Sequence, residues 1–235
     1  MKVQSGRVVA VILAAALSAG AAQSDEAPNI HMAALASITV DGTKSCGAVP
    51  IGATLVMTSA HCVVEEGASE PVHPEAIELS ITAFGSEAET RRVADIGTPK
   101  GFFYEGIPTR DVVGRDIALL RLADPITSFE AVLPPAEGLT HAAMRTIADG
   151  QHYPVEICET RVEDGNVMAL ECARAPGSSG SPIFTVINDK RAVIGIVSAG
   201  GERGDGSPLT FATVAQPLFS EITWFMRDRG AITGF

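Results

Sequence analysis

The sequence predicts an all-β protein built from two halves, with one helix at its C-terminal end. Short segments with apolar residues in alternation or in brief runs recur along most of the chain, separated by turn residues. Pro134 and Pro135 divide the chain near its middle, where two prolines prevent both a helix and a central strand. With 235 residues, 46% of them hydrophobic, each half can bury a core of its own. The pattern is compatible with two barrels or with a pair of sandwiches.

The expected strands form two sets, one on each side of the linker at 134–138. The first set covers residues 35–40, 53–59, 77–84, 91–96 and 117–122, and the second covers 145–148, 155–162, 167–172, 182–187, 192–198 and 209–214. These sets predict one domain over 23–133 and a second over 134–235. The helix is expected to begin near Pro217, to present Leu218, Ile222 and Phe225 on an apolar face, and to end at Gly230.

Residues 1–22 have the pattern of a signal peptide. Lys2 and Arg7 precede an alanine-rich apolar run that ends in small residues before the polar QSDE at 23–26. The run has about 15 residues, fewer than the roughly 20 that span a bilayer, and an uncleaved membrane anchor is the alternative interpretation. We expect a secreted or periplasmic protein. In such an oxidising compartment, four cysteines are expected to form two disulfides: Cys46, Cys62, Cys158 and Cys172.

The charge balance argues against nucleic acids and anionic membranes as partners. The chain has 28 acidic and 17 basic residues, for a net charge of −11, and two of the basic residues lie within the signal segment. Such a field repels phosphate backbones and anionic lipid surfaces. No cysteine spacing has the Cys-x-x-Cys form typical of zinc sites, and we expect neither a metal nor another cofactor.

Three short motifs stand out from the strand pattern, in the order histidine, aspartate, serine. They are TSAHC at 58–62, DIALL at 116–120 and GSSGSP at 177–182. Separately, each has an ordinary interpretation, as a surface histidine, a turn aspartate and a flexible loop. Together they supply a base, an orienting carboxylate and a nucleophile in one of the chain orders known for such triads. We expect His61, Asp116 and Ser179 to be the catalytic residues.

The motifs resemble those of the chymotrypsin-like (trypsin-like) serine proteases, whose patterns are TAAHC, DIALL and GDSGGP. The serine motif differs at Ser178 and Ser181, and in this form it is most similar to the bacterial glutamyl-endopeptidase branch. The resemblance extends to VSAG at 197–200 and to the terminal helix around Trp224. It implies two six-stranded antiparallel β-barrels with a C-terminal helix, and a secreted serine endopeptidase acting on protein or peptide substrates.

We expect this protein to be a monomer. An inactive homologue that binds a partner protein and an esterase are the alternative functions. Fluorophosphonate labelling separates an active enzyme from an inactive homologue.

The resemblance also implies roles around the triad. His61 would take the proton of Ser179, and Asp116 would orient the imidazole. The backbone N–H groups of Gly177 and Ser179 would form the oxyanion hole. Gly180 would leave the path of the substrate free of a side chain.

Other residues of the same types are weaker candidates. Asp111 lacks the apolar strand that directly follows Asp116, and Ser178 and Ser181 are out of register with the motif serine. The remaining histidines have no motif context and are expected at the surface or in packing: His31, His73, His141 and His152.

Candidate substrate-binding residues lie before the serine motif and along 197–200. They are Arg174, Ser198, Ala199 and Gly200, bordered by Ala173, Ala175, Pro176 and Gly201. The resemblance also implies that Ser198 lies beside Asp116, and an ordinary serine at a strand end is the alternative. The absence of an aspartate at these positions argues against a preference for lysine or arginine. Arg174 could pair with an acidic side chain, whereas Val197 stands where the glutamyl-endopeptidase branch usually has a histidine. An acidic preference and a small or apolar preference therefore both stay open.

The resemblance bears on the disulfides and on activation. The family bridges the positions of Cys46 and Cys62, which leaves Cys158 and Cys172 for a bridge across a hairpin turning at 164–166. In the digestive relatives a new N-terminus, IVGG, pairs with the aspartate before the nucleophile. Here no IVGG precedes the first expected strand, and Ser178 is neutral. We expect an oxyanion hole that forms without this ion pair; the alternative is a short inhibitory propeptide at about 23–32.

Overall fold

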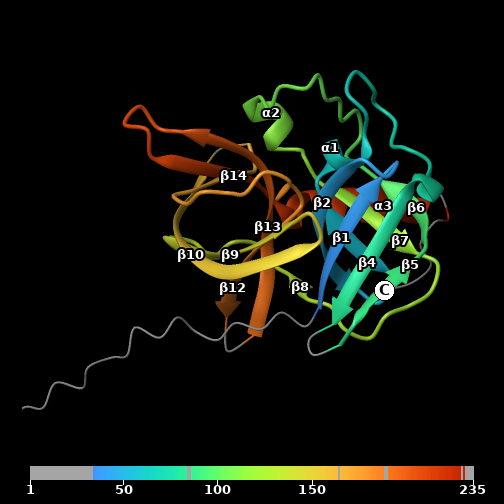
Figure 1. The fold of residues 1–235 in the computed structure, drawn as a ribbon. Helices are drawn as coiled ribbons and strands as arrows, with labels where there is room; N and C mark the ends of the chain where they lie inside the picture. Colours follow the sequence, from blue (N-terminus) through green and yellow to red (C-terminus); the bar gives the residue numbers. More distant parts are fainter. Residues whose placement is uncertain (1–33, 84–85, 164, 188–189, 229, 231–235) are drawn as a thin grey trace, which may run out of the picture.

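The fold consists of two sheets, the first built from strands within residues 34–122 and the second from strands within residues 131–214 (Figure 1). The second sheet therefore begins with β8 (Ala131–Val132), shortly before the linker at 134–138. The structure, a computed structural model, describes residues 34–83, 86–163, 165–187, 190–228 and 230. The first sheet has the order β5-β4-β1-β2-β3-β7-β6 and comprises β1 (Ala34–Val40), β2 (Lys44–Gly52), β3 (Leu55–Thr58), β4 (Ile77–Ala83), β5 (Ala88–Arg91), β6 (Val93–Gly97) and β7 (Ala118–Leu122). The second has the order β12-β9-β10-β11-β14-β13-β8 and comprises β8 (Ala131–Val132), β9 (His141–Ala148), β10 (Gln151–Glu163), β11 (Val167–Leu170), β12 (Pro182–Ile187), β13 (Lys190–Glu202) and β14 (Pro208–Val214).

Both sheets have barrel-like curvature. In the second, β12 pairs with both β9 and β13, which closes a six-stranded barrel, and β8 is added beside β13. In the first, the edge strands β5 and β6 follow each other in the chain with only Arg92 between them. The expected two-barrel, chymotrypsin-like fold with a C-terminal helix is confirmed. Three details differ: the first sheet is a half-barrel whose edge strands β5 and β6 do not pair among the described residues, each sheet has a seventh strand, and β8 pairs in parallel rather than antiparallel orientation.

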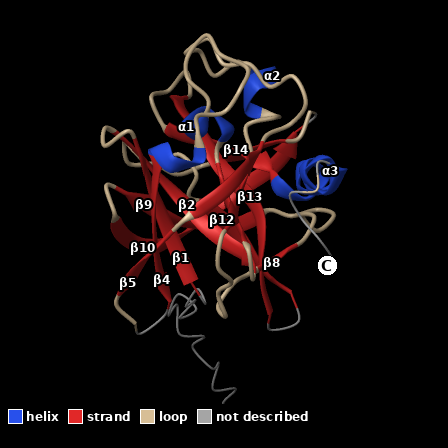
Figure 2. Ribbon diagram, turned by 90° about the vertical axis from the view of Figure 1, so that its right-hand side faces the viewer, coloured by secondary structure: helices blue, strands red, loops and turns tan. Residues whose placement is uncertain are grey.

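Three apolar cores hold this arrangement together, one in each barrel and one between them. The core between the barrels draws Leu119 from the first sheet and Phe184 and Ile196 from the second, all fully buried. The last helix, α3 (Ala215–Asp228), adds Leu218, Ile222 and Met226 to the same core. It lies beside β13 (Figure 2) and also packs against β6 and β7. Because each such side chain contributes about 1.5–3 kcal/mol when buried, this core holds the two barrels in one relative position.

The helix differs from its expected form in one residue of its buried face. Pro217 lies in the first turn as expected, but Met226 is buried where Phe225 was expected, and Phe225 is only partly covered. Residues 218, 222 and 226 are spaced by four, so they share a face. A Cβ at Gly97 would lie 2.6 Å from side-chain atoms of Ile222 and Met226, so glycine in β6 allows the helix to approach the sheet.

The sequence pattern missed three strands, β2, β5 and β8, and three short helical turns. The β2 segment, KSCGAVPIG, contains two glycines and a proline and has no alternation, although it is largely buried between β1 and β3. The turns are α1 (Ala60–Val63), α2 (Arg110–Val113) and the 3₁₀ helix η1 (Pro74–Ala76). Within the described residues, no helix has the length and hydropathy needed to cross a membrane.

Candidate active site

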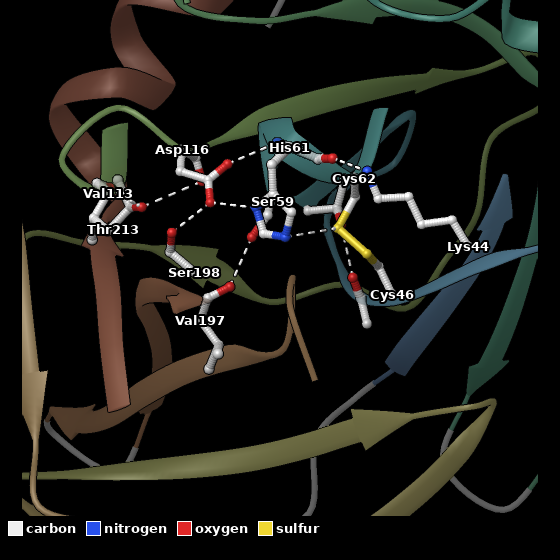
Figure 3. Close-up of polar contacts among 12 residues, drawn as sticks. Lys44, Cys46, Ser59, His61, Cys62, Val113, Asp116, Val197, Ser198 and Thr213 are labelled. Carbon is white, nitrogen blue, oxygen red and sulfur yellow. Dashed lines mark hydrogen bonds and ion pairs between the residues drawn. A yellow bond between two sulfur atoms is a disulfide. The ribbon is translucent and has the colours of Figure 1, made fainter. Parts of the chain in front are cut away.

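His61 lies in α1, the single turn that directly follows β3. Its backbone N–H donates to Oδ1 of Asp116 at 2.8 Å, and its ring Nδ1 lies 2.6 Å from Oδ2 of the same carboxylate (Figure 3). One carboxylate therefore fixes both the backbone and the ring of the histidine. With Nδ1–H donating to Asp116, Nε2 carries the lone pair and is free to accept a proton.

Asp116 lies in the loop between α2 and β7 and is fully buried. Burial acts to raise its pKa, but the charge of His61 and hydrogen bonds from His61 and Ser198 outweigh it, so the pKa of Asp116 lies below its usual value. The Ser198 hydroxyl donates to Oδ2, the oxygen that also contacts the His61 ring. The carboxylate is thus held ionised between the two barrels, since Ser198 belongs to β13 of the second sheet.

Ser179 lies in the loop between β11 and β12, and this loop is attached to the strands beside His61. The Ser179 carbonyl accepts a hydrogen bond from the Gly47 amide in β2 at 2.7 Å. Gly47 follows Cys46, which is bonded to Cys62, the neighbour of His61. The next residue, Gly180, donates to the Val197 carbonyl in β13 at 2.8 Å. These contacts bring the serine loop to the histidine turn although the two lie in different halves of the chain.

No direct bond joins the two expected reacting atoms. Among the described residues, the Ser179 hydroxyl has no hydrogen-bond partner, and His61 Nε2 lies 3.9 Å from Sγ of Cys62. Catalytic hydrogen bonds of unliganded sites often tighten only when substrate binds. The structure therefore brings His61, Asp116 and Ser198 into contact and holds Ser179 nearby through its backbone.

Two glycines give the serine loop its shape. Gly177 and Gly180 have φ values of +77° and +83°, a region that favours glycine. A Cβ at Gly180 would lie 2.0 Å from the Gly47 carbonyl oxygen and 2.4 Å from the Thr58 hydroxyl. Glycine at 180 is therefore explained by close packing against the first barrel rather than by the passage of substrate.

The two backbone N–H groups that are expected to donate to the oxyanion form no hydrogen bond among the described residues. They are the amides of Gly177 and Ser179. Between them, the Ser178 amide donates to the Ala175 carbonyl at 3.2 Å, which closes a turn over residues 175–178. Two free amides on either side of one residue are the kind of donor pair that binds a developing oxyanion.

The other candidate serines differ in their surroundings. The Ser181 hydroxyl contacts both the amide and the carbonyl of Ile147, at 2.8 and 3.1 Å, so it has a structural role. The Ser178 hydroxyl is buried and has no partner among the described residues. The expectation for activation stays a prediction, because the N-terminal residues 1–33 lie outside the described residues.

The remaining weaker candidates lie away from the site or outside the described residues. Asp111 is in the exposed first turn of α2, and His73 caps η1 by accepting from the Glu75 amide. His141 and His152 are exposed on β9 and β10. His31 lies outside the described residues.

Only some of the candidate substrate-binding residues line one common cavity. Arg174 and Gly200 line a cavity beside the serine loop, together with Ala173, Pro176 and Gly201. Ser198 instead faces Asp116. The Ala199 side chain is buried in a small apolar cluster with Val113 and Val167.

Sequence reasoning missed two residues that support His61. The Lys44 ammonium donates to the His61 carbonyl, and burial lowers its pKa although Asp116 and Glu65 act in the opposite direction. Ser59, which precedes α1, donates to the Val197 carbonyl at 2.7 Å and so joins the histidine turn to β13. Ser59 could have been noticed within its motif, whereas nothing in the sequence around Lys44 indicates this contact.

The structure contains disulfides Cys46–Cys62 and Cys158–Cys172, with the second across the β10–β11 hairpin as expected. Cys46, Cys62 and His61 bring three potential metal ligands within 4.8 Å of one another. Because both cysteines are oxidised, they offer no thiolate, and this cluster does not fit a metal ion.

The fold and the buried histidine–aspartate pair together define a protein of the chymotrypsin-like class. The trypsin family model matches residues 22–152, more than half of the chain. The chain therefore belongs to the trypsin family of serine proteases. The matched segment includes His61 and Asp116 and ends before Ser179. A comparison with curated proteins gave no match.

Proposed function

We propose that this protein is a serine endopeptidase that hydrolyses peptide bonds through Ser179, His61 and Asp116. The observation that carries the proposal is the contact of 2.6 Å between His61 Nδ1 and the buried Asp116 carboxylate, beside the attached serine loop. A serine hydroxyl is a poor nucleophile at neutral pH and needs an adjacent, correctly oriented base. The Asp116 carboxylate provides that orientation and stabilises the imidazolium that forms.

The reaction would proceed through an acyl-enzyme. Ser179 Oγ attacks the carbonyl carbon while His61 Nε2 takes the hydroxyl proton, and the amides of Gly177 and Ser179 donate to the oxyanion. The carbon–nitrogen bond breaks as His61 returns that proton to the leaving amine, which leaves an ester on Ser179. Water, deprotonated by His61, then hydrolyses the ester, releases the carboxylic acid and restores the serine hydroxyl.

We further propose that the protein acts outside the cytoplasm as a monomer, in the periplasm or in the medium. The signal pattern at 1–22 and two disulfides support export, because disulfides persist in oxidising compartments. Residues 1–22 lie outside the described residues, so N-terminal sequencing of the exported protein is the direct test. The narrower similarity to glutamyl endopeptidases stays a prediction from the serine motif.

Labelling with a fluorophosphonate tests the catalytic assignment. The wild type should be labelled at Ser179, identified by mass spectrometry of its peptides. Ser179→Ala and His61→Ala should fold, lose labelling and lower kcat by about 10⁴-fold, because the triad acts as one unit. Ser178→Ala is the matched control, since that hydroxyl has no partner and its loss should leave labelling intact.

The outcomes separate the proposal from its alternatives. Labelling that persists in Ser179→Ala would assign the nucleophile to another residue. A folded wild type that is not labelled at all would indicate an inactive homologue with a binding function. Turnover of esters without any turnover of peptides would indicate an esterase.

A further inference from the structure

An open cavity of about 600 Å³ lies beside the serine loop. Its lining is mostly small or apolar, with Ala173, Pro176, Gly200 and Leu209 among the lining residues, and its two charged residues are Arg174 and Glu202. In a cavity with this lining, a small number of polar groups is left to select a ligand.

The cavity is lined by residues that lie close in the chain to the candidate catalytic residues. Arg174 lies five residues before Ser179 on the same loop. Gly200 lies two residues after Ser198 in β13, and Ser198 donates to Asp116. A peptide whose carbonyl carbon contacts Ser179 therefore has this cavity next to it, on the side formed by the serine loop and β13.

The Arg174 side chain lies along the cavity wall, against the backbone of Gly200. A Cβ at Gly200 would lie 2.4 Å from Nε of Arg174 and 3.2 Å from both Cδ and Cζ. The end of the Arg174 side chain, from Cδ to Cζ, is therefore packed on the β13 backbone at Gly200. Any larger residue at position 200 would occupy this space. Packing of this kind restricts the arginine rotamer and gives the guanidinium a defined position.

The Arg174 guanidinium has no acceptor of its own. Within the described part of the chain it forms no ion pair, and its buried Nε has no hydrogen-bond partner. Arg91, Arg121 and Arg145 also have a buried Nε without a partner among the described residues, but of these four arginines only Arg174 lines this cavity. Arg203 on the neighbouring turn is paired with Glu171. In a chain with 28 acidic residues, a partly buried arginine without a carboxylate is left available for an external one.

We propose that Arg174 selects substrates with an acidic side chain, aspartate or glutamate, at the residue on the acyl side of the cleaved bond. This inference rests on the proposed peptidase function and specifies its substrate class. The planar guanidinium accepts a carboxylate through two parallel N–H donors, a geometry that neither an amide nor an apolar side chain reproduces. Glu202 is exposed at the cavity rim, where solvent and salt screen its charge.

The kinetic test compares peptides that differ only in glutamate or its neutral isostere glutamine at this residue. For the wild type, kcat/KM for the glutamate peptide should be about 10- to 100-fold higher, as expected for hydrogen bonds to a charged group. Arg174→Gln should reduce this ratio to near one, and Arg174→Glu should favour lysine instead. Arg91→Gln is the control: it removes an arginine on β5, away from the cavity, and should preserve the ratio.

A binding test makes the inference independent of catalysis. Peptides ending in glutamate or glutamine, each with an amidated C-terminus, are titrated into Ser179→Ala by calorimetry. The glutamate peptide should bind more tightly, and the difference should disappear in the Ser179→Ala, Arg174→Gln double variant. A second pair, with and without the C-terminal amide, determines whether a terminal carboxylate rather than a side chain is recognised.

Each outcome decides between the two proposals. Fluorophosphonate labelling without a glutamate preference, or with a preference for lysine or arginine, would overturn the inference and leave the peptidase function standing. A glutamate preference that survives Arg174→Gln would overturn the role of Arg174. Binding that requires a free C-terminal carboxylate would also overturn the side-chain assignment. Glutamate-dependent binding without any labelling would overturn the peptidase function alone.

Discussion

Ser198 in the second barrel donates its hydroxyl proton to Oδ2 of Asp116 in the first, the same oxygen that contacts the His61 ring (Figure 3). The two residues are 82 positions apart in the chain. This bond connects the two barrels directly at the charged centre of the site. It also leaves Oδ2 with two donors, which favours the ionised carboxylate.

Ser198→Ala should lower kcat by about 10-fold with little change in KM. The substitution removes one charge-assisted hydrogen bond to Asp116, and Asp116 acts through His61 without contacting the substrate. Steady-state kinetics with a peptide substrate gives both constants. Ser220→Ala, an exposed serine on α3, is the matched control and should be neutral. A change confined to KM would contradict a role through Asp116 and would indicate a direct contact with substrate.

Asp116 should make stability depend on pH in the acid range. Its folded-state pKa is lowered, so its contribution is fully present above the unfolded value of about 3.9 and is lost as pH falls through the lower folded value. Asp116→Asn should be less stable than the wild type by about 1–3 kcal/mol at pH 7, and the gap should narrow by pH 3. Urea unfolding of both proteins at pH 7 and pH 3 measures this difference in the free energy of unfolding. An equal gap at pH 7 and pH 3 would contradict this assignment.

The two disulfides should have similar effects on stability and different effects on activity. Their sequence separations are 16 and 14 residues, and closing such a loop contributes about 3 kcal/mol in the chain-entropy model. The double variant Cys46→Ala, Cys62→Ala should lose that stability and also lower kcat, because the bridge holds the histidine turn to β2. Cys158→Ala, Cys172→Ala should lose stability alone. Unfolding and kinetics of both variants test this prediction, and peptide mapping that finds Cys46 joined to Cys158 would refute both pairings.

Gly180→Ala should disrupt the serine loop. The substitution combines a φ of +83° with a Cβ only 2.0 Å from the Gly47 carbonyl oxygen, so it should cost about 3 kcal/mol or more and abolish labelling of Ser179. Gly204→Ala is the control: its Cβ would meet no atom within 4 Å, and its effect should stay within about 0.5 kcal/mol. Equal stability and labelling of the two variants would show that the loop does not depend on this packing.

Much of the candidate site could be predicted from the sequence because its chemistry lies in short motifs. His61, Asp116 and Ser179 each follow or precede an apolar strand, and their order is that of a known triad. The strands themselves were predicted where apolar residues alternate or cluster. By contrast, β2 was missed because Pro50 and its glycines give no such pattern, although this strand holds the serine loop through Gly47.

The sequence by itself determined the all-β class, the two halves, the terminal helix and the identity of the candidate triad, since these depend on local periodicity and on contiguous motifs. Only the tertiary structure decided that Lys44 supports the site, that Gly180 is needed for packing, and that Arg174 lies across Gly200 without a partner. Those contacts join segments that are far apart in the chain, such as Ser59 and Val197 at a separation of 138 residues. A pattern of neighbouring residues carries no information about such contacts, because they are set by how the two barrels pack against each other.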